Sequence, residues 1–301
     1  MKTLLIYNHL SGKGRIHKDL KKIEAFFYHR SWSLEMIAID DQEATNLIQQ
    51  QILDYELILI AGGDGTVHSV ISILMNYDET LRPKVMVLPY GTTNDVAHML
   101  KIPKNINKAL KLLTLGVHKK IDINKANDTY FVYAAAVGKF SKISYEINRK
   151  SLKFLGHLGY FLNIYRDLFN HYYMNVHLTS HNYDIKRKSF FIILVSGNRV
   201  GGFKLKRFRE SIKLNDGLIG IRIMTRNHMF SWYKMIWFYL FKGKHFKNDL
   251  HFNVSEAKLT FETPYQWNID GEKGPLGDLY IKVFKEAIDI YVHPKVEKEL
   301  F

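Results

Sequence analysis

The 301-residue sequence contains no cysteine, no long apolar run and few acidic residues. The lack of cysteine excludes disulfides and thiolate metal sites, which suits a reducing compartment. The aromatic-rich stretch MIWFYLF has seven residues between Lys234 and Lys242, far fewer than the ~20 that cross a bilayer. The opening MKTLLIYN has too short an apolar part for a signal peptide, so it predicts a strand.

The shortage of acidic residues gives the chain a strong basic excess. Asp and Glu number 29 against 43 Lys and Arg, a formal net charge of +14 at pH 7. Such a chain attracts polyanions, either nucleic acid or an anionic membrane leaflet. A surface kept soluble by its charge explains the same excess, so charge alone does not identify a partner. The length is sufficient for two domains with their own cores.

The first ~125 residues alternate strand and helix patterns, as in a parallel α/β sheet. Apolar runs such as LILIA (57–61) predict strands that are covered on both faces. The predicted strands are Thr3–Asn8, Leu34–Asp40, Glu56–Gly62 and Lys84–Tyr90. The predicted helices cover residues 17–30, 41–53, 66–76 and 93–100.

After Ile123 the pattern changes to strand-like runs with few helices, which predicts a mostly antiparallel β domain, a sandwich rather than a barrel. We therefore expect an α/β nucleotide-binding domain with a parallel sheet over residues 1–124, followed by a β-sandwich domain over 125–289. The last residues, about 290–301, are expected to return to the first domain. Two helical stretches, 142–171 and 232–241, interrupt the second domain. The aromatic stripe of the latter is expected to pack in a core or pocket rather than in a lipid interface.

Three predicted strands end in loops rich in Gly, Ser, Thr or Asn, and each loop precedes a helix. The loops are YNHLSGKGR (7–15), GGDGT (62–66) and YGTTND (90–95). The carboxyl ends of parallel strands share the sheet edge where α/β sheets bind ligands, and glycines there let backbone N–H groups approach phosphate. One such loop is an ordinary turn, but three together predict a phosphate site. The first is not a Walker A motif, and the protein-kinase motifs are absent.

Asp64 lies between the glycines of the second loop. A carboxylate facing a triphosphate repels it unless a divalent cation lies between them, and Mg²⁺ that bridges to phosphate oxygens is the usual arrangement. The alternative is that Asp64 caps a helix beginning near Thr66. The glycines on both sides favour the metal role.

With these loops, the sequence resembles the diacylglycerol kinase catalytic-domain family of soluble bacterial lipid kinases, which also includes sphingosine kinases. GGDGT, GTTND, NRVGGF (198–203), LNDGLIGI (214–221) and IDGE (269–272) occur in that family's order. The resemblance covers essentially the whole chain. GGDGT alone is shared with NAD kinases and resembles phosphofructokinases, so the later motifs provide the discrimination.

The resemblance implies an ATP- and Mg²⁺-dependent kinase that converts diacylglycerol, or a similar lipid alcohol, to phosphatidic acid or its equivalent. It places nucleotide contacts at Asn8, His9, Leu10, Ser11, Gly12, Gly62, Gly63, Asp64, Gly65, Thr66, Val67, His68, Ser69, Thr92, Thr93, Asn94 and Asp95. Asp64 and Asp95 would organise Mg²⁺ and its waters, with Asp122 as an addition.

The same resemblance makes Glu272 the catalytic base, with Asp64 as the other catalytic residue. Phosphoryl transfer to an alcohol needs an acceptor such as a carboxylate near the hydroxyl. WNIDGEKG (267–274) supplies Asp270 and Glu272 beside a tight turn. A surface hairpin has the same local pattern, because Asp-Gly is a common hairpin dipeptide.

A second metal site is implied at LNDG, with Asp216 and the carbonyls of Lys213 and Leu218 as ligands. A hairpin turn at 216–217 is the alternative. This chain departs from the relatives here, because Asn215 replaces a frequent second Asp and Lys213 adds a positive charge. Other departures are His9 and Leu10 without the usual proline, His68 and Ser69 in place of Asn and Glu, and Ala38 in place of a Thr.

A lipid kinase must reach its alcohol at the bilayer, so basic groups are candidates for docking on an anionic membrane. They are Lys13, Arg15, Lys18, Lys21, Lys22, Arg149, Lys150, Lys153, Lys204, Lys206, Arg207 and Arg209. The apolar run Phe154–Phe169 would line an acyl-chain pocket or pack a helix on the sandwich. We expect a cytoplasmic protein at the inner face of the membrane and no nucleic-acid partner, and a homodimer is left open.

Two other functions compete with the lipid kinase. An NAD kinase is motivated by GGDGT, although an Asn-Glu pair would be expected where this chain has GTTND. A non-catalytic basic protein that binds membrane or nucleic acid is motivated by the net charge of +14, and it predicts salt-sensitive binding of polyanions.

Overall fold

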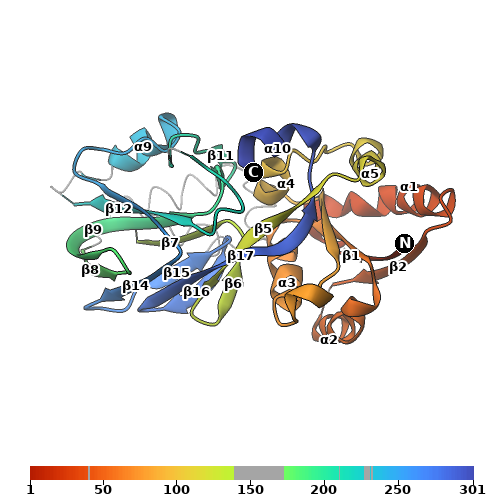
Figure 1. Cartoon of the computed structure of the whole chain (residues 1–301), viewed down its shortest axis with the longest axis horizontal. Coiled ribbons are helices and arrows are strands. Elements are labelled where there is room, and N and C mark those ends of the chain that lie inside the picture. The colour runs from red at the N-terminus through yellow and green to blue at the C-terminus, as the bar shows by residue number, and fades with distance from the viewer. Residues whose placement is uncertain (40, 139–172, 210, 227–230, 232) are drawn as a thin grey trace. The chain divides into compact units, whose positions relative to one another are not determined.

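The computed structural model describes residues 1–39, 41–138, 173–209, 211–226, 231 and 233–301. The chain forms two compact units (Figure 1). The first comprises residues 1–123, 213–217 and 284–301, and the second comprises 124–212 and 218–283. The predicted helical stretch 142–171 lies outside the described residues, as do Arg149, Lys150, Lys153 and the run Phe154–Phe169.

The first unit is a parallel sheet with helices on both faces, as predicted. Its strand order is β2 (Ser33–Ala38), β1 (Lys2–Tyr7), β3 (Leu57–Gly62), β4 (Lys84–Pro89) and the end of β17 (Leu279–Tyr291). All six residues of β3 are buried, which explains its unbroken apolar sequence. The observed strand ends lie within two residues of the predicted ones.

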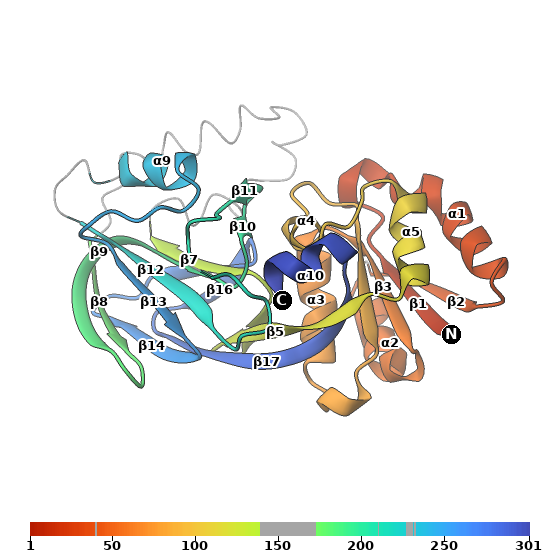
Figure 2. The same cartoon turned by 45° about the horizontal axis from the view of Figure 1, so that its top comes forward.

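Helices α1 (Ile16–Tyr28) and α5 (Ile106–Leu115) cover one face, and α2 (Gln42–Gln51) and α3 (Asp64–Leu74) cover the other (Figure 2). This follows from right-handed crossovers, because the chain moves first from β1 to β2 and then back across the sheet to β3 and β4. The remaining elements are η1 (Ser11–Gly14), η2 (Ile52–Asp54), η3 (Glu79–Leu81), α4 (Asp95–Met99), β5 (His118–Ala126) and α10 (Pro294–Leu300).

The second unit is an antiparallel β structure, which confirms the predicted fold class. Its strands are β6 (Thr129–Phe131), β7 (Ala134–Gly138), β8 (Met174–Thr179), β9 (Asp184–Val195), β10 (Arg199–Val200), β11 (Phe203–Lys204), β12 (Ile219–Thr225), β13 (Leu250–Val254), β14 (Glu256–Phe261), β15 (Gln266–Ile269), β16 (Glu272–Leu276) and the start of β17. The main order is β16–β15–β7–β9–β8–β14–β17, and β12 pairs with β9 and β13.

Strand β9 separates two apolar cores of the second unit. Ile192 and Leu194 face the larger core, which also contains the fully buried Trp267. Phe191 and Ile193 point the other way, into a smaller core beneath helix α9 (Tyr233–Leu240). This alternation is the period of two expected of a strand, and it explains why the end of β9 is buried on both faces.

Three features differ from the predicted organisation. Residues 213–217 belong to the first unit rather than the second, and the return to the first unit begins at Phe284 rather than near 290. Helix α5 was not predicted. Among the described residues, no helix is long and apolar enough to cross a bilayer.

Candidate active site

The three glycine-containing loops meet at the carboxyl edge of the parallel sheet, as predicted. The order β2–β1–β3–β4 places the topological switch between β1 and β3, which is the point where open α/β sheets bind ligands. The N–H of Asn8 after β1 donates to the carbonyl of Ala61 in β3 at 3.1 Å. The N–H groups of Tyr90 and Gly91 after β4 both donate to the carbonyl of Gly62 at 3.0 Å.

Glycine is required where these loops touch, because a side chain would occupy the neighbouring loop. A Cβ on Gly91 would lie 2.3 Å from the Cα of Gly63. Gly12 has a positive φ of 56°, and a Cβ there would lie 2.0 Å from the carbonyl oxygen of Tyr90. The glycines therefore permit the close approach of all three loops, which brings their backbone N–H groups together.

Asp64 is the buried carboxylate of this junction, with 8% of its surface exposed. It is the first residue of α3, which begins two residues earlier than predicted, and Gly63 provides no side-chain cap. One oxygen of Asp64 accepts from the Thr93 hydroxyl at 2.8 Å, and the other accepts from the Val96 N–H at 3.2 Å. Asp64 thus caps α4 rather than its own helix, so the predicted capping alternative is wrong for α3.

The turn before α4 is held by Asn94, which has a positive φ of 51°. Its side-chain oxygen accepts from the Gly91 N–H at 2.7 Å, and its side-chain nitrogen donates to the Gly91 carbonyl at 2.8 Å. Asp95, at the start of α4, is fully buried. The sequence therefore uses Asn94 to close the loop and Asp64 to anchor it, while Thr92 and Thr93 remain exposed.

The first loop turns on Asn8, whose side-chain oxygen accepts from the Leu10 N–H at 2.9 Å. Leu10 itself is 76% exposed. The His9 ring stacks on His17 of α1 with centroids 5.7 Å apart. Below the loop, the Tyr90 hydroxyl donates to Asp19 at 3.0 Å, and burial together with the Asp19 charge raises the pKa of Tyr90.

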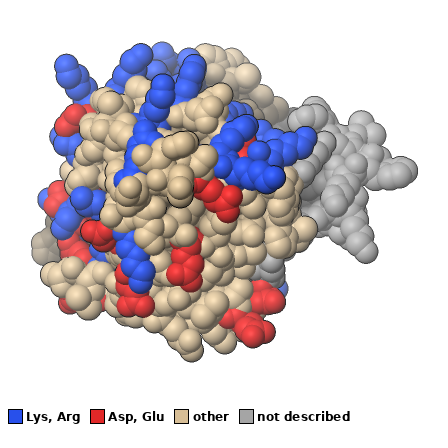
Figure 3. Space-filling view, turned by 90° about the vertical axis from the view of Figure 1, so that its right-hand side faces the viewer, with Lys and Arg blue, Asp and Glu red and all other residues tan. Residues whose placement is uncertain are grey.

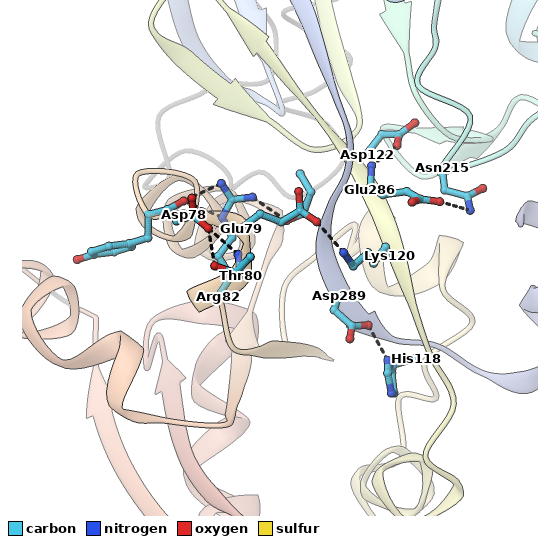
Figure 4. A network of polar contacts seen from close by, with 12 residues as sticks. Asp78, Glu79, Thr80, Arg82, His118, Lys120, Asp122, Asn215, Glu286 and Asp289 are labelled. Atoms are coloured by element: carbon cyan, nitrogen blue, oxygen red, sulfur yellow. Dashed lines mark hydrogen bonds and ion pairs between the residues drawn. The ribbon is translucent and has the colours of Figure 1, made fainter.

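Asp122 lies in a separate polar cluster of the first unit (Figure 4). This carboxylate accepts from the Gly217 N–H at 2.6 Å and from the Glu286 N–H at 2.8 Å. Burial raises the pKa of Asp122, the two backbone hydrogen bonds oppose the rise, and the charges of Asp216 and Glu286 add to it. The side-chain amide of Asn215 donates to Glu286 at 3.4 Å. Asp122 therefore joins the loop 213–217 to strand β17.

One of the three proposed ligands of a second metal is already used by a donor of the protein. The Leu218 carbonyl accepts from the Arg209 guanidinium at 3.1 Å, and Asn215 supplies an N–H₂ group where a carboxylate would attract a cation. Within the described residues, no group of three or more His, Cys, Asp or Glu is arranged to hold a metal ion. The Arg209 contact and the Asn215 amide weaken this site for a divalent cation, so the second metal at Asp216 stays a prediction and we assign it no chemical step.

In the second unit, Asp270 and Glu272 belong to the β15–β16 hairpin. Asp270 and Gly271 form its turn, with φ angles of 49° and 91°, so the hairpin interpretation of the local sequence is correct. Asp270 is buried and accepts the N–H groups of Val132, Tyr133 and Ala134 at 2.6, 3.0 and 3.0 Å. Glu272 is exposed at the start of β16, so its carboxylate is available to a ligand in a way that Asp270 is not.

The NRVGGF motif is also a hairpin. Strands β10 and β11 are joined by Gly201 and Gly202, with φ angles of 59° and 86°. One residue of the basic group that follows differs from the sequence prediction: Arg209 is only 5% exposed. Its contact with the Leu218 carbonyl makes it a structural residue rather than a membrane-facing one.

Glycine loops that meet at a switch point around a buried carboxylate are typical of α/β units that bind phosphate groups. Comparison with known proteins identifies the family. The model of the diacylglycerol kinase catalytic domain matches residues 2–126. The diacylglycerol kinase of Bacillus subtilis (strain 168) is 30% identical over 278 residues, which cover 90% of this chain and 89% of that protein. That of Staphylococcus carnosus (strain TM300) is 25% identical over 300 residues, covering 97% and 95%.

Solved structures agree with this assignment. A crystal structure from Bacillus anthracis strain Sterne superposes with a TM-score of 0.80 at 26% identity and covers 98% of this chain and 96% of that one. A diacylglycerol kinase structure from the same strain, 24% identical, has the same fold with a TM-score of 0.79. The chain belongs to the diacylglycerol kinase family, a family of lipid kinases.

Proposed function

We propose that this protein transfers the γ-phosphate of ATP to the hydroxyl of diacylglycerol or a similar lipid alcohol, in a Mg²⁺-dependent reaction that yields phosphatidic acid or its equivalent. The observation that supports this best is the junction of three loops around Asp64 in a chain that belongs to the diacylglycerol kinase family. Phosphoryl transfer depends mainly on positioning and on neutralising charge, and a glycine-lined sheet edge provides both.

ATP would lie along the three loops of the first unit. The first loop, from Asn8 to Gly12, and Thr92 would contact the nucleotide, and the stretch from Gly62 to Ser69 would surround its phosphates. The absence of a side-chain cap on α3 favours this, because its first N–H groups are left for a ligand. The exposed hydroxyl of Thr92 would supply a further hydrogen bond, whereas the Thr93 hydroxyl already donates to Asp64.

Asp64 would hold Mg²⁺ against the phosphates, with Asp95 assisting. Each Asp64 oxygen accepts one hydrogen bond from the protein, at 2.8 and 3.2 Å. A carboxylate offers about four lone-pair sites, so both oxygens retain capacity for a cation or its waters, and the residues present fit the ion. When bound, Mg²⁺ supplies charge neutralisation for the transferring phosphoryl group.

Glu272 would act as the catalytic base that accepts the proton of the lipid hydroxyl. Its exposure leaves the carboxylate accessible, and the turn held by Asp270 fixes its backbone. Substitution of Glu272 by Gln keeps the size and removes the basicity, so we expect turnover to fall by a factor of about 10²–10⁴. Asp278→Asn is the matched control, because Asp278 is an exposed carboxylate in the same unit.

The decisive assay is transfer of labelled γ-phosphate to a panel of lipid alcohols, with NAD and sphingosine as separate acceptors. Transfer to diacylglycerol that is lost in Glu272→Gln and in Asp64→Asn, but kept in Asp278→Asn, supports the proposal. Transfer to NAD with none to any lipid would establish the rival NAD kinase. Near-parental transfer by Glu272→Gln would show that the base is another group.

Membrane access is part of the same proposal. The face that α1 and α5 line shows Lys and Arg gathered along its upper part (Figure 3). The exposed basic residues of these helices and their flanking loops are Arg15, Lys18, Lys21, Lys22, Lys104, Lys108 and Lys111. Each would add about 1 kcal/mol of attraction when close to an anionic bilayer. A peripheral position at the inner face of the membrane agrees with such a surface.

A further inference from the structure

Helix α9 exposes an apolar surface that the protein core does not use. Ile236, Trp237, Leu240 and Phe241 are 52%, 46%, 68% and 40% exposed. The rings of Trp237 and Phe241 stack with centroids 4.5 Å apart. Phe203, 53% exposed, packs its ring on Tyr239 at 4.8 Å and extends the surface. We call Phe203, Ile236, Trp237, Leu240 and Phe241 the α9 face.

The opposite side of the helix accounts for the core packing that the sequence predicted. Met235 and Phe238 are buried in the smaller core with Phe208 and Phe191. Apart from Lys234, both sides of the helix therefore carry apolar side chains, although only one side packs in a core within the described residues. The expectation that the whole stripe packs in a core is wrong for the α9 face. An exposed patch of this kind marks an interaction surface.

In the two described segments that form the α9 face, the exposed charged residues are all cations. The exposed charged residues of segments 198–209 and 233–248 are Lys204, Lys206, Arg207, Lys242, Lys244 and Lys247. Neither segment contains Asp or Glu. The N–H of Arg207 donates to the Lys242 carbonyl at 2.8 Å, which holds the two segments together. Lys234 is excluded from this rim, because it is buried and paired with Asp249 at 2.8 Å.

This pattern selects among possible occupants. Aromatic side chains with flanking lysines match the boundary between head groups and acyl chains of a bilayer. A second copy of the chain would bring the same cationic rim against itself in a symmetric contact. Nucleic acid would neutralise the lysines but would leave the exposed Trp237, Leu240 and Phe241 without apolar partners.

We propose that the α9 face, in addition to the basic surface of the first unit, docks on an anionic membrane, with Trp237, Leu240 and Phe241 inserted at the head-group boundary. The inference rests on the proposed function in one respect only, namely that the lipid alcohol resides in a bilayer. No residue of the α9 face has been assigned a role in the chemistry, so docking and catalysis are separable by mutation.

The test compares binding of the full chain to vesicles of phosphatidylglycerol and phosphatidylcholine with binding to phosphatidylcholine alone, by co-sedimentation. Trp237→Ala/Phe241→Ala should lower the partition coefficient on the anionic vesicles more than about tenfold. Lys242→Gln/Lys244→Gln should lower it about fivefold per lysine. Leu81→Ala is the control, because Leu81 is 58% exposed in the first unit, and it should bind as the parent does.

Four outcomes would overturn the proposal. The first two are vesicle binding by Trp237→Ala/Phe241→Ala as strong as that of the parent, and an equal loss of binding in Leu81→Ala. The other two are a parent that does not bind anionic vesicles, and a parent that forms a dimer which the double variant dissociates without any change in vesicle binding. Activity separates the two proposals. With short-chain diacylglycerol dispersed in water, the double variant should keep parental turnover. Parental vesicle binding without transfer to any lipid alcohol would refute the kinase proposal and leave docking intact.

Discussion

Asp270 provides the sharpest test of how the hairpin that holds Glu272 is stabilised. Its carboxylate accepts three backbone N–H groups from the 132–134 segment, and it is 3% exposed. The substitution Asp270→Asn isolates the carboxylate, because Asn tolerates the positive φ of 49° that Asp270 adopts.

The magnitude follows from these contacts. An amide keeps one oxygen, which can accept from Tyr133 and Ala134, but it places an N–H₂ group against the N–H of Val132. One charge-assisted hydrogen bond, about 1.5–3 kcal/mol, is lost, and a buried donor is left unpaired for about 1–3 kcal/mol more. We expect Asp270→Asn to lower the free energy of unfolding by about 2.5–6 kcal/mol, a large part of the total stability of a typical domain.

Amide hydrogen exchange measures this loss of stability at the residues that contact Asp270. In Asp270→Asn, the amides of Val132, Tyr133 and Ala134 should exchange faster than in the parent, and urea unfolding should begin at a lower concentration. Asp278→Asn is the control, because the exposed Asp278 accepts from only one backbone N–H, that of Phe261 at 2.9 Å. If exchange over residues 132–134 and the unfolding curve both match the parent, the account of the buried carboxylate is refuted.

Three further predictions concern other parts of the chain. Gly91→Ala would place a methyl group 2.3 Å from a backbone Cα of the neighbouring loop. We expect about 1–3 kcal/mol of destabilisation in thermal melting and weaker ATP binding in calorimetry. An unchanged ATP affinity would argue against the loop junction. Burial, with the charges of Lys295 and Lys101, lowers the pKa of His293, whose Nδ1 caps α10 by accepting from the Lys295 N–H. As the pH falls, His293 therefore takes up a proton at a higher pH in the unfolded chain than in the folded one. The stability that it contributes above about pH 6.5 is lost as the pH falls through the folded pKa. His293→Asp should remove this part of the Tm change between pH 7.5 and 5, and a Tm profile identical to that of the parent would contradict the prediction. Lys234→Met leaves the buried Asp249 without its cation and should destabilise by about 3–5 kcal/mol in chemical denaturation. The double variant with Asp249→Leu should recover only part of this, because the Thr225 N–H and carbonyl also lose their partners; equal losses in both would be inconsistent with a charge effect.

The first unit was predictable from the sequence because its information is local. Continuous apolar runs mark fully buried strands, and the glycine loops follow them directly. Helix α5 was missed although its ends have local markers: the Asn105 side chain accepts from the Lys108 N–H, and Gly116 has a φ of 66°. Reading residue 105 as an N-cap would have found it.

The features that were not predicted depend on residues far apart in the chain. Asp122 and Glu286 are 164 residues apart, and their hydrogen bond adds a contact between β5 and β17, which are also paired in the sheet. Asp64 caps a helix 32 residues later rather than its own. The burial of Arg209 had no local marker, since a cluster of cations predicts solvent exposure. Such pairings are tertiary, so no pattern of neighbouring residues encodes them.

The division of strand β17 has a practical consequence. The chain passes between its units four times, after residues 123, 212, 217 and 283, and the final segment supplies Ile290 as the partner of Val85 on β4. A fragment ending at residue 126, where the match to the catalytic-domain model ends, would leave that flank of β4 with open N–H and C=O groups beside an apolar strand. Truncation there should yield an aggregation-prone polypeptide rather than an independently folded nucleotide-binding domain.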